Sequence, residues 1–210
     1  VVLLGTVFPL AVEAVSGRQV TVGGPYFRVT TVPLLLLLTY RVGYTPPFGS
    51  RSFHTTLTLQ SLSAADTVAM IEGEGGRSFA VTADVSQSSD VQRYVQASLD
   101  AFGRIDCFFN NAGIEGDLAP THEYDIAMFD RIIRVNLRSM FLGLRFVIPH
   151  MVAAGKGAVV NTASIGSERG LAGACAYNAA KHGAVGLTRT AASEVAQKGV
   201  RVNCVMPGVI

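Results

Sequence analysis

Charge is scarce in this chain of 210 residues: 15% of the residues are charged, and the formal net charge is +2. Binding to nucleic acid phosphates needs a concentration of positive charge that this balance does not offer. Long apolar runs are also missing, because the longest, at residues 32–38, is far shorter than the ~20 residues that span a bilayer. The sequence therefore predicts neither nucleic acid nor a membrane as a partner.

Cysteine is equally rare, and the three residues of this type, Cys107, Cys175 and Cys204, show no C-x-x-C spacing. An odd number of scattered cysteines indicates free thiols in a reducing compartment, so we expect a cytoplasmic protein. The four histidines, His54, His122, His150 and His182, also lack the spacing of metal ligands. We expect no metal site.

The 49% of hydrophobic residues argues against disorder and for one folded core. From Ala64 onward, strand-like and helix-like segments alternate, which predicts an α/β fold with a parallel sheet and helices on both faces. The expected helices cover residues 64–71, 89–102, 126–151 and 177–196, and the expected strands cover residues 78–85, 105–109, 158–162 and 200–205.

Three side chains at a suggestive spacing carry the chemistry: Ser164, Tyr177 and Lys181. In a helix, Tyr177 and Lys181 lie one turn apart on the same face. An ammonium this close favours the phenolate, so the pair can exchange a proton with a substrate. Tyr-x-x-x-Lys alone is weak evidence, because a solvated helix face produces the same spacing. The serine thirteen residues upstream, after a predicted strand, makes the pattern more specific.

Several further motifs accompany these three side chains. The chain contains an N-N-A-G turn, Asn110-Asn111-Ala112-Gly113, together with Asn136, the pair Asp84-Val85 and the turn Pro207-Gly208. From about Ala64 to the last residue, the chain resembles a short-chain dehydrogenase/reductase. The resemblance implies a Rossmann-like, doubly wound sheet and a nicotinamide cofactor, NAD or NADP.

The family resemblance also implies residue roles. The catalytic residues are then Asn136, Ser164, Tyr177 and Lys181. Tyr177 is the general acid/base, Lys181 also holds the nicotinamide ribose, Ser164 binds the substrate oxygen, and Asn136 holds a water. The implied cofactor contacts are Asp84, Val85, Asn110, Asn111, Ala112, Gly113, Tyr177, Lys181, Pro207, Gly208 and Ile210. Read without the family, Asn136 is better explained by a structural role on an apolar helix face, and the presence of Ser164, Tyr177 and Lys181 downstream reverses that order.

One part of the family pattern is not found. About fifty residues before Asp84 the family has a strand, a T-G-x-x-x-G-x-G turn and a helix. The glycines of residues 1–65 do not have this spacing. Backbone amides at such a turn normally receive the cofactor pyrophosphate. We therefore expect the first strand–helix–strand unit to be atypical or missing.

Residues 1–65 form a segment of uncertain origin, distinct from a Rossmann core at residues 66–210. The segment carries four arginines and a single acidic residue, Glu13, which is typical of a transit peptide, yet five prolines interrupt it. We favour a third explanation, a shifted reading frame or an unspliced segment. No methionine begins the chain, and it stops two residues after Gly208, so we expect it to be shortened at both ends.

Two functions follow from this pattern. The first is an oxidoreductase that moves hydride between a nicotinamide cofactor and a small secondary alcohol or ketone, acting as a homo-oligomer, either a tetramer or a dimer as in the family. The alternative is a non-catalytic or defective chain that at most associates with intact subunits, and the missing glycine turn favours it.

Overall fold

The computed structural model describes residues 64–73 and 75–208. Our expectations for residues 1–63 and for Ile210 lie outside the described residues. In the described part of the chain, no helix is long and apolar enough to cross a membrane.

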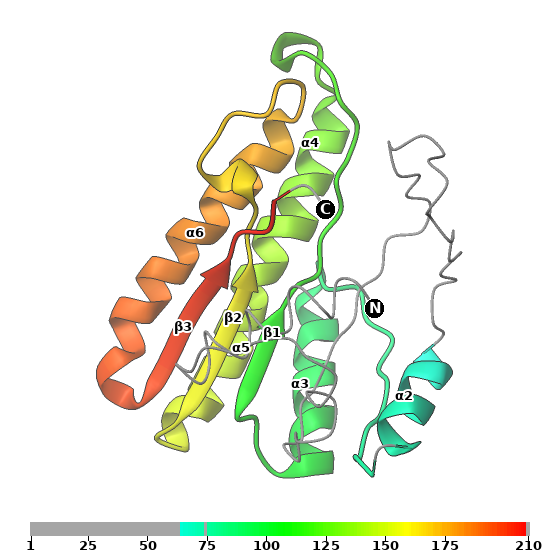
Figure 1. The fold of residues 1–210 in the computed structure, drawn as a ribbon, viewed down its shortest axis with the longest axis vertical. Helices are drawn as coiled ribbons and strands as arrows, with labels where there is room; N and C mark the ends of the chain where they lie inside the picture. The colour runs from blue at the N-terminus through cyan, green and yellow to red at the C-terminus, as the bar shows by residue number, and fades with distance from the viewer. Residues whose placement is uncertain (1–63, 74, 209–210) are drawn as a thin grey trace, which may run out of the picture.

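Three parallel strands form the sheet: β1 (Cys107–Asn110), β2 (Gly157–Thr162) and β3 (Val200–Val205), paired in the order β1-β2-β3 (Figure 1). In the register, Asn110 lies opposite Asn161, and Thr162 lies opposite Val205. Parallel neighbours need a crossover connection, which helices provide here. The carboxyl ends of the strands therefore meet at a single edge.

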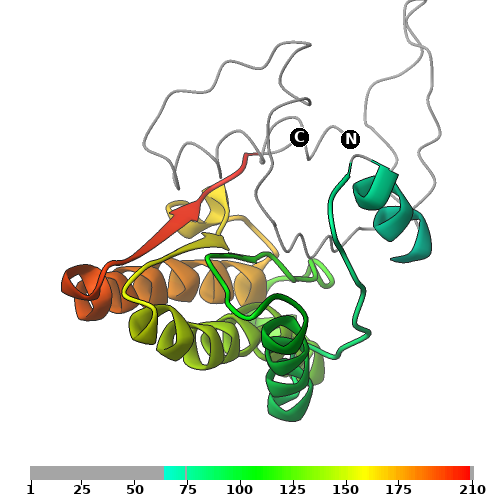
Figure 2. The ribbon, with the colours of Figure 1, turned by 90° about the horizontal axis from the view of Figure 1, so that it is seen from below.

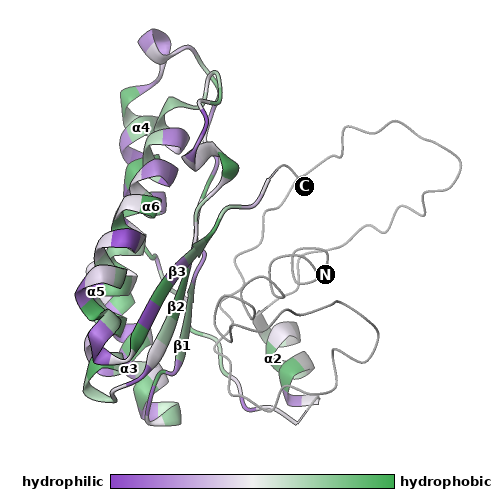
Figure 3. Ribbon diagram, turned by 60° about the vertical axis from the view of Figure 1, so that its left-hand side comes forward, coloured by the Kyte–Doolittle hydropathy of each residue, from purple (hydrophilic) through white to green (hydrophobic). Residues whose placement is uncertain are grey.

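The helices between the strands are α4 (Ile126–Ile132), a π-helical segment (Ile133–Arg138) and α5 (Ser139–Ala153) before β2, and α6 (Cys175–Val195) before β3. Before β1 come α2 (Ala64–Gly73) and α3 (Ser88–Phe102), and short 3-10 turns lie at Thr121–Glu123, Ile165–Ser167 and Ala196–Lys198. Helices α3, α5 and α6 cover one side of the sheet, and α2 lies on the other (Figures 2 and 3).

The core lies between the sheet and these three helices. Its fully buried members include Val91 on α3, Val147 and Met151 on α5, and Val159 and Val200 on the strands. The apolar stripe on α3 recurs every three to four residues, which is why this helix turns one face to the core. The elements built on this periodicity were predicted well: α3, the α4–α5 run, α6, β2 and β3 lie within a few residues of their expected bounds.

One predicted strand is wrong. Residues 78–84 form neither helix nor strand, and a turn follows at Val85. The apolar alternation of this segment is typical of a strand, but a strand also needs a neighbour for its backbone groups. In the described part of the chain, β1 pairs only with β2, so no strand supplies hydrogen-bond partners to residues 78–85.

Candidate active site

Polar residues gather where the strands end at their carboxyl edge. The side chain of Thr162, the last residue of β2, donates a hydrogen bond to Asn111 Oδ1 at 2.7 Å. Asn110, the last residue of β1, donates from Nδ2 to the Met140 carbonyl oxygen at 3.0 Å. Ligands of parallel α/β sheets bind outside this edge, so these contacts lie where a ligand is expected to bind. They also show that Asn110 is used to hold β1 against α5.

Tyr177 and Lys181 lie in the first two turns of α6, which begins at Cys175. The Lys181 side chain is only 5% exposed, and its Nζ donates to the Thr162 carbonyl oxygen at 2.7 Å. The same Nζ lies 5.6 Å from the centroid of the Tyr177 ring. Burial lowers the pKa of Lys181 from 10.5 to about 8, because a desolvated ammonium is less stable. The helical spacing therefore brings phenol and ammonium together as predicted.

Asn136 lies in the π-helical segment and is fully buried. Its Oδ1 accepts from the Ile114 backbone N–H and its Nδ2 donates to the Ile114 carbonyl oxygen, both at 2.7 Å. A π-turn within an α-helix is rare and often marks a functional position. Here the π-turn contains Asn136, whose side-chain amide binds the backbone of Ile114, in the chain that leaves β1.

Gly113 brings the Asn136 and Lys181 side chains into one place. A Cβ at Gly113 would lie 3.3 Å from Asn136 Oδ1 and 3.8 Å from Lys181 Nζ. The N-N-A-G turn thus packs directly over both polar groups, and a side chain there would crowd the amide. Asn136, Lys181 and Tyr177 belong to one contiguous site.

Ser164 stands at the start of the short turn Ile165–Ser167. Its Oγ accepts from the Gly166 backbone N–H at 3.1 Å, and its own N–H donates to Ser167 Oγ at 3.1 Å. These bonds form a capping box, so the serine has a structural use as well. Because its oxygen accepts from the backbone, its hydroxyl proton is free to point elsewhere.

Ser164 is also placed near the beginning of α6. A Cβ at Gly166 would lie 3.5 Å from both Ser164 Oγ and Asn178 Oδ1, so Gly166 lies between the serine and the residue that follows Tyr177. The Ile165 backbone N–H donates to the Pro207 carbonyl oxygen at 2.9 Å, which joins the predicted Pro207-Gly208 turn to the same cluster. Among the described residues, the Ser164 side chain forms no hydrogen bond with Tyr177.

Asp84 and Val85 lie at the neighbouring turn, before α3. Asp84 is exposed, and its Oδ1 accepts from Ser86 Oγ at 2.7 Å and from the Ser86 N–H at 2.9 Å. These two bonds hold the pKa of the Asp84 carboxyl below its usual value, so the group is an ionised acceptor at neutral pH. This turn is separate from the cluster around Lys181.

Two sets of contacts were not foreseen from the sequence: the bond from Lys181 to the Thr162 carbonyl oxygen, and the bonds between Asn136 and the Ile114 backbone. Thr162 and Ile114 take part in them through backbone atoms, which carry no signal in the residue type. Among the described residues no group of three or more histidine, cysteine or acidic side chains is placed to hold a metal ion.

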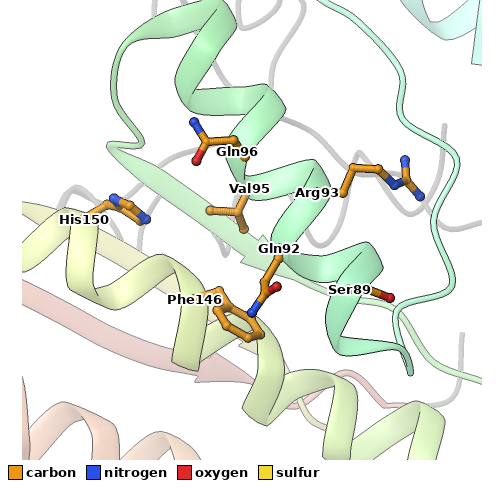
Figure 4. A pocket seen from close by; sticks show the side chains of 7 residues that line it. All are labelled: Ser89, Gln92, Arg93, Val95, Gln96, Phe146 and His150. Carbon is orange, nitrogen blue, oxygen red and sulfur yellow. The ribbon is translucent and has the colours of Figure 1, made fainter.

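An open groove lies elsewhere, between α3 and α5 (Figure 4). It is lined by Ser89, Gln92, Arg93, Val95, Gln96, Phe146 and His150. None of the predicted site residues belongs to it. We therefore locate the candidate active site at the carboxyl edge of the sheet, where buried polar groups converge.

Comparison with known proteins decides the family, because the short chain dehydrogenase family model matches residues 49–210. The chain belongs to the short-chain dehydrogenase family. Among curated proteins, this short-chain dehydrogenase is 43% identical over 162 residues to levodione reductase of Leifsonia aquatica, covering 77% of this chain and 61% of the relative. It is 41% identical to cyclohexanol dehydrogenase of Acinetobacter sp. (strain SE19), covering 70% and 59%.

Solved structures agree with the fold. The structure of NAD+-bound xylitol dehydrogenase matches with a TM-score of 0.67 and 32% identity, over 69% of this chain and 56% of that one. ElxO with NADP bound matches with a TM-score of 0.62 and 32% identity, over 65% and 54%. The Rossmann-like sheet of a short-chain dehydrogenase is thereby confirmed. The chain spans only 61% and 59% of the length of these two curated relatives.

Proposed function

We propose that this protein is an oxidoreductase that transfers hydride between a nicotinamide cofactor, NAD or NADP, and a small secondary alcohol or ketone. The observation that carries the proposal is the buried Lys181 ammonium, which donates to the Thr162 carbonyl oxygen and lies 5.6 Å from the Tyr177 ring. A buried cation beside a phenol is costly to maintain, and proton transfer to a substrate oxygen gives it a use.

The donors and acceptors present fit two parts of such a cofactor. An ammonium has three N–H donors, and among the described residues Lys181 uses one of them on Thr162, which leaves two for ribose hydroxyls. The ionised, exposed Asp84 carboxylate suits the amino group of adenine. For the pyrophosphate, the sequence contains no glycine-rich turn of the family type. When bound, the nicotinamide supplies the hydride.

The protein's own residues then handle the proton and the developing charge. Tyr177 Oη gives a proton to the ketone oxygen during reduction and takes it from the alcohol during oxidation. The Ser164 hydroxyl donates to the same substrate oxygen and stabilises its negative charge. Lys181 holds the ribose and lies beside the Tyr177 ring. The Asn136 amide fastens Ile114 beside Lys181, and its remaining donor and lone pair hold a water on the proton's way to Lys181.

The remaining residues would hold the other parts of the cofactor. Val85, Asn111, Ala112 and Gly113 would contact it between adenine and ribose, and Pro207 and Gly208 would contact the nicotinamide. Asn110 would support these contacts indirectly, through Met140. Supporting the substrate class, the relatives carry the names levodione reductase and cyclohexanol dehydrogenase. We further propose a homo-oligomer in the cytoplasm, with a Rossmann core at residues 66–210.

A second function remains in competition: a non-catalytic family member that at most associates with intact subunits. The specific observation in its favour is that residues 78–85 form no strand in the described part of the chain. The two functions differ in cofactor binding. We expect the unmodified chain to bind either reduced cofactor weakly or not at all, since unpaired phosphates add several kcal/mol to the cost of immobilising the ligand. Micromolar binding in a calorimetric titration would instead mean that residues 1–63 provide a phosphate site.

The activity itself is tested in a chain whose residues 1–63 are replaced by a family-type first strand, glycine-rich turn and second strand. We expect it to oxidise or reduce at least one member of a panel of cyclic and aliphatic secondary alcohols and ketones, measured by nicotinamide absorbance with both cofactors. Absence of turnover on every substrate with both cofactors would disprove the proposed reaction.

A further inference from the structure

Side chains of neighbouring helices, rather than strand pairing, hold the segment that leads to Asp84. The Asp90 carboxylate of α3 accepts the Asp84 N–H at 2.7 Å, and two arginines contact carbonyl groups on either side of Asp84 in the sequence. Residues 78–85 pair with no strand in the part of the chain that the structure describes. Arg93 Nη2, from α3, donates to the Thr82 carbonyl oxygen at 2.8 Å. Arg138 Nη1, from the π-helical segment, donates to the Ser86 carbonyl oxygen. Two carbonyl groups around this turn are therefore satisfied by guanidinium groups from neighbouring helices.

Ser86 and Asp84 are joined by two hydrogen bonds. The Asp84 carboxylate accepts both the N–H and the hydroxyl of Ser86, and the Gln87 N–H donates to the Asp84 carbonyl oxygen at 2.9 Å. Ser86 is 5% exposed, so it lies inside the turn. A bond to the Ser86 carbonyl thus acts directly on the position of the Asp84 carboxylate.

Arg138 reaches this turn from a helical segment that is itself anchored at the active site. Asn136, two residues earlier, is fixed to the Ile114 backbone by two hydrogen bonds. The same π-helical segment therefore contacts the turn after β1 through Asn136 and the Asp84 turn through Arg138. The separation between these two turns is set by one short piece of helix.

We propose that Arg138 is a positioning residue for the adenosine half of the cofactor, because it holds the Asp84 turn at a set distance from the catalytic centre. This inference rests on the proposed function, in which the Asp84 carboxylate accepts from the adenine amino group. Arg138 itself touches no part of the cofactor. Without it the turn samples other positions, and a site that is competent only part of the time binds more weakly in proportion.

The test uses the unmodified chain and two fragments of the cofactor, adenosine 5′-monophosphate and nicotinamide mononucleotide. Their dissociation constants are measured by titration of backbone amide chemical shifts. Arg138→Met keeps the length of the side chain and removes its donors. We expect it to raise the dissociation constant of adenosine monophosphate about tenfold and to change that of nicotinamide mononucleotide by less than about twofold. Before any ligand is added, the amides of Val85, Ser86 and Gln87 should shift, and that of Ile114 should not.

Three further variants sharpen the result. Arg138→Lys keeps a donor, so it should bind adenosine monophosphate within about threefold of the parent. Arg134→Met removes an exposed arginine one helical turn earlier and should change the affinity for neither fragment. If Arg138→Met does not fold, Arg138→Leu, which also has no donor, takes its place with the same expected loss.

The outcomes separate the inference from the proposed function. If the parent binds adenosine monophosphate and the Arg138 variants bind it equally well, the positioning role is wrong, whether or not the turn amides move. An equal loss of both fragments would likewise reject it, because that indicates general damage. If the parent does not bind adenosine monophosphate at all, the adenosine contact in the proposed function is wrong, and the inference fails with it.

Discussion

Asn136 and Ile114 exchange two hydrogen bonds, from amide nitrogen to carbonyl oxygen and from backbone N–H to amide oxygen, each 2.7 Å long. The pair joins the π-helical segment to the chain that leaves β1. Gly113, the residue before Ile114, packs against both Asn136 and Lys181. The amide thus serves structure and site together, so the two explanations of Asn136 that the sequence leaves open are compatible.

Replacement of this amide should be costly. In Asn136→Ala, a fully buried side chain is truncated and the part-buried Ile114 N–H and carbonyl group lose their partners, so we expect the free energy of unfolding to fall by about 2–4 kcal/mol. Urea denaturation measures it. Gln92→Ala, which removes an exposed amide from α3, is the control and should change stability by less than about 0.5 kcal/mol. A loss below about 1 kcal/mol for Asn136→Ala would show that water replaces the amide easily.

Lys181 should reduce stability at neutral pH. Because burial lowers its pKa to about 8, the folded protein releases this proton at lower pH than the unfolded chain, whose lysine titrates near 10.5. The penalty is complete below pH 8 and disappears as the pH rises from about 8 to about 10.5. We expect Lys181→Met to raise the free energy of unfolding at pH 7 by on the order of 2 kcal/mol.

The advantage of Lys181→Met over the parent should shrink between pH 8 and pH 10, where the parent itself gains stability. Urea titrations at both pH values measure this difference. Lys198→Met, at an exposed position, provides the control, and its stability should follow that of the parent throughout. A pH-independent difference between Lys181→Met and the parent would contradict the lowered pKa.

Gly199 allows the chain to turn into β3. Its φ is +74°, and a Cβ there would lie 2.0 Å from the Gly155 carbonyl oxygen, which belongs to the backbone and cannot move aside easily. We expect Gly199→Ala to destabilise the protein by about 3 kcal/mol or more. In Gly186→Ala, on α6, the new Cβ meets no atom within 4 Å, and stability should rise by about 0.5–1 kcal/mol. Thermal unfolding of both variants tests the pair, and equal effects would reject the clash.

Tyr177 should be essential for turnover but not for cofactor affinity. In the chain with a family-type N-terminus, Tyr177→Phe keeps the ring and loses the transferable proton, so turnover should fall at least about a hundredfold. Cofactor affinity should change by less than about twofold, since the Lys181 ammonium stays in place. Tyr124→Phe is a matched control from the same cluster, because the Tyr124 hydroxyl has no hydrogen-bond partner in the part of the chain that the structure describes. Substantial activity of Tyr177→Phe at any pH would exclude its acid/base role.

Local patterns account for what was predictable. The spacing of Tyr177 and Lys181 is a property of any helix, and α6 places them one turn apart as expected. The apolar stripes of α3 and α5 likewise identify which faces are buried. Residues 78–85 show the limit of this reasoning, because alternation describes only one strand, and a strand exists only beside another.

The sequence by itself determined the family, the order of the helices and the identity of the side chains available for chemistry, since these depend on residue type and on local spacing. Only the tertiary structure decided what those side chains contact. Lys181 donates to the backbone of Thr162, Asn136 to that of Ile114, and Arg138 to that of Ser86. Backbone carbonyl groups are the same at every residue, so their partners depend on how distant segments pack and not on any motif.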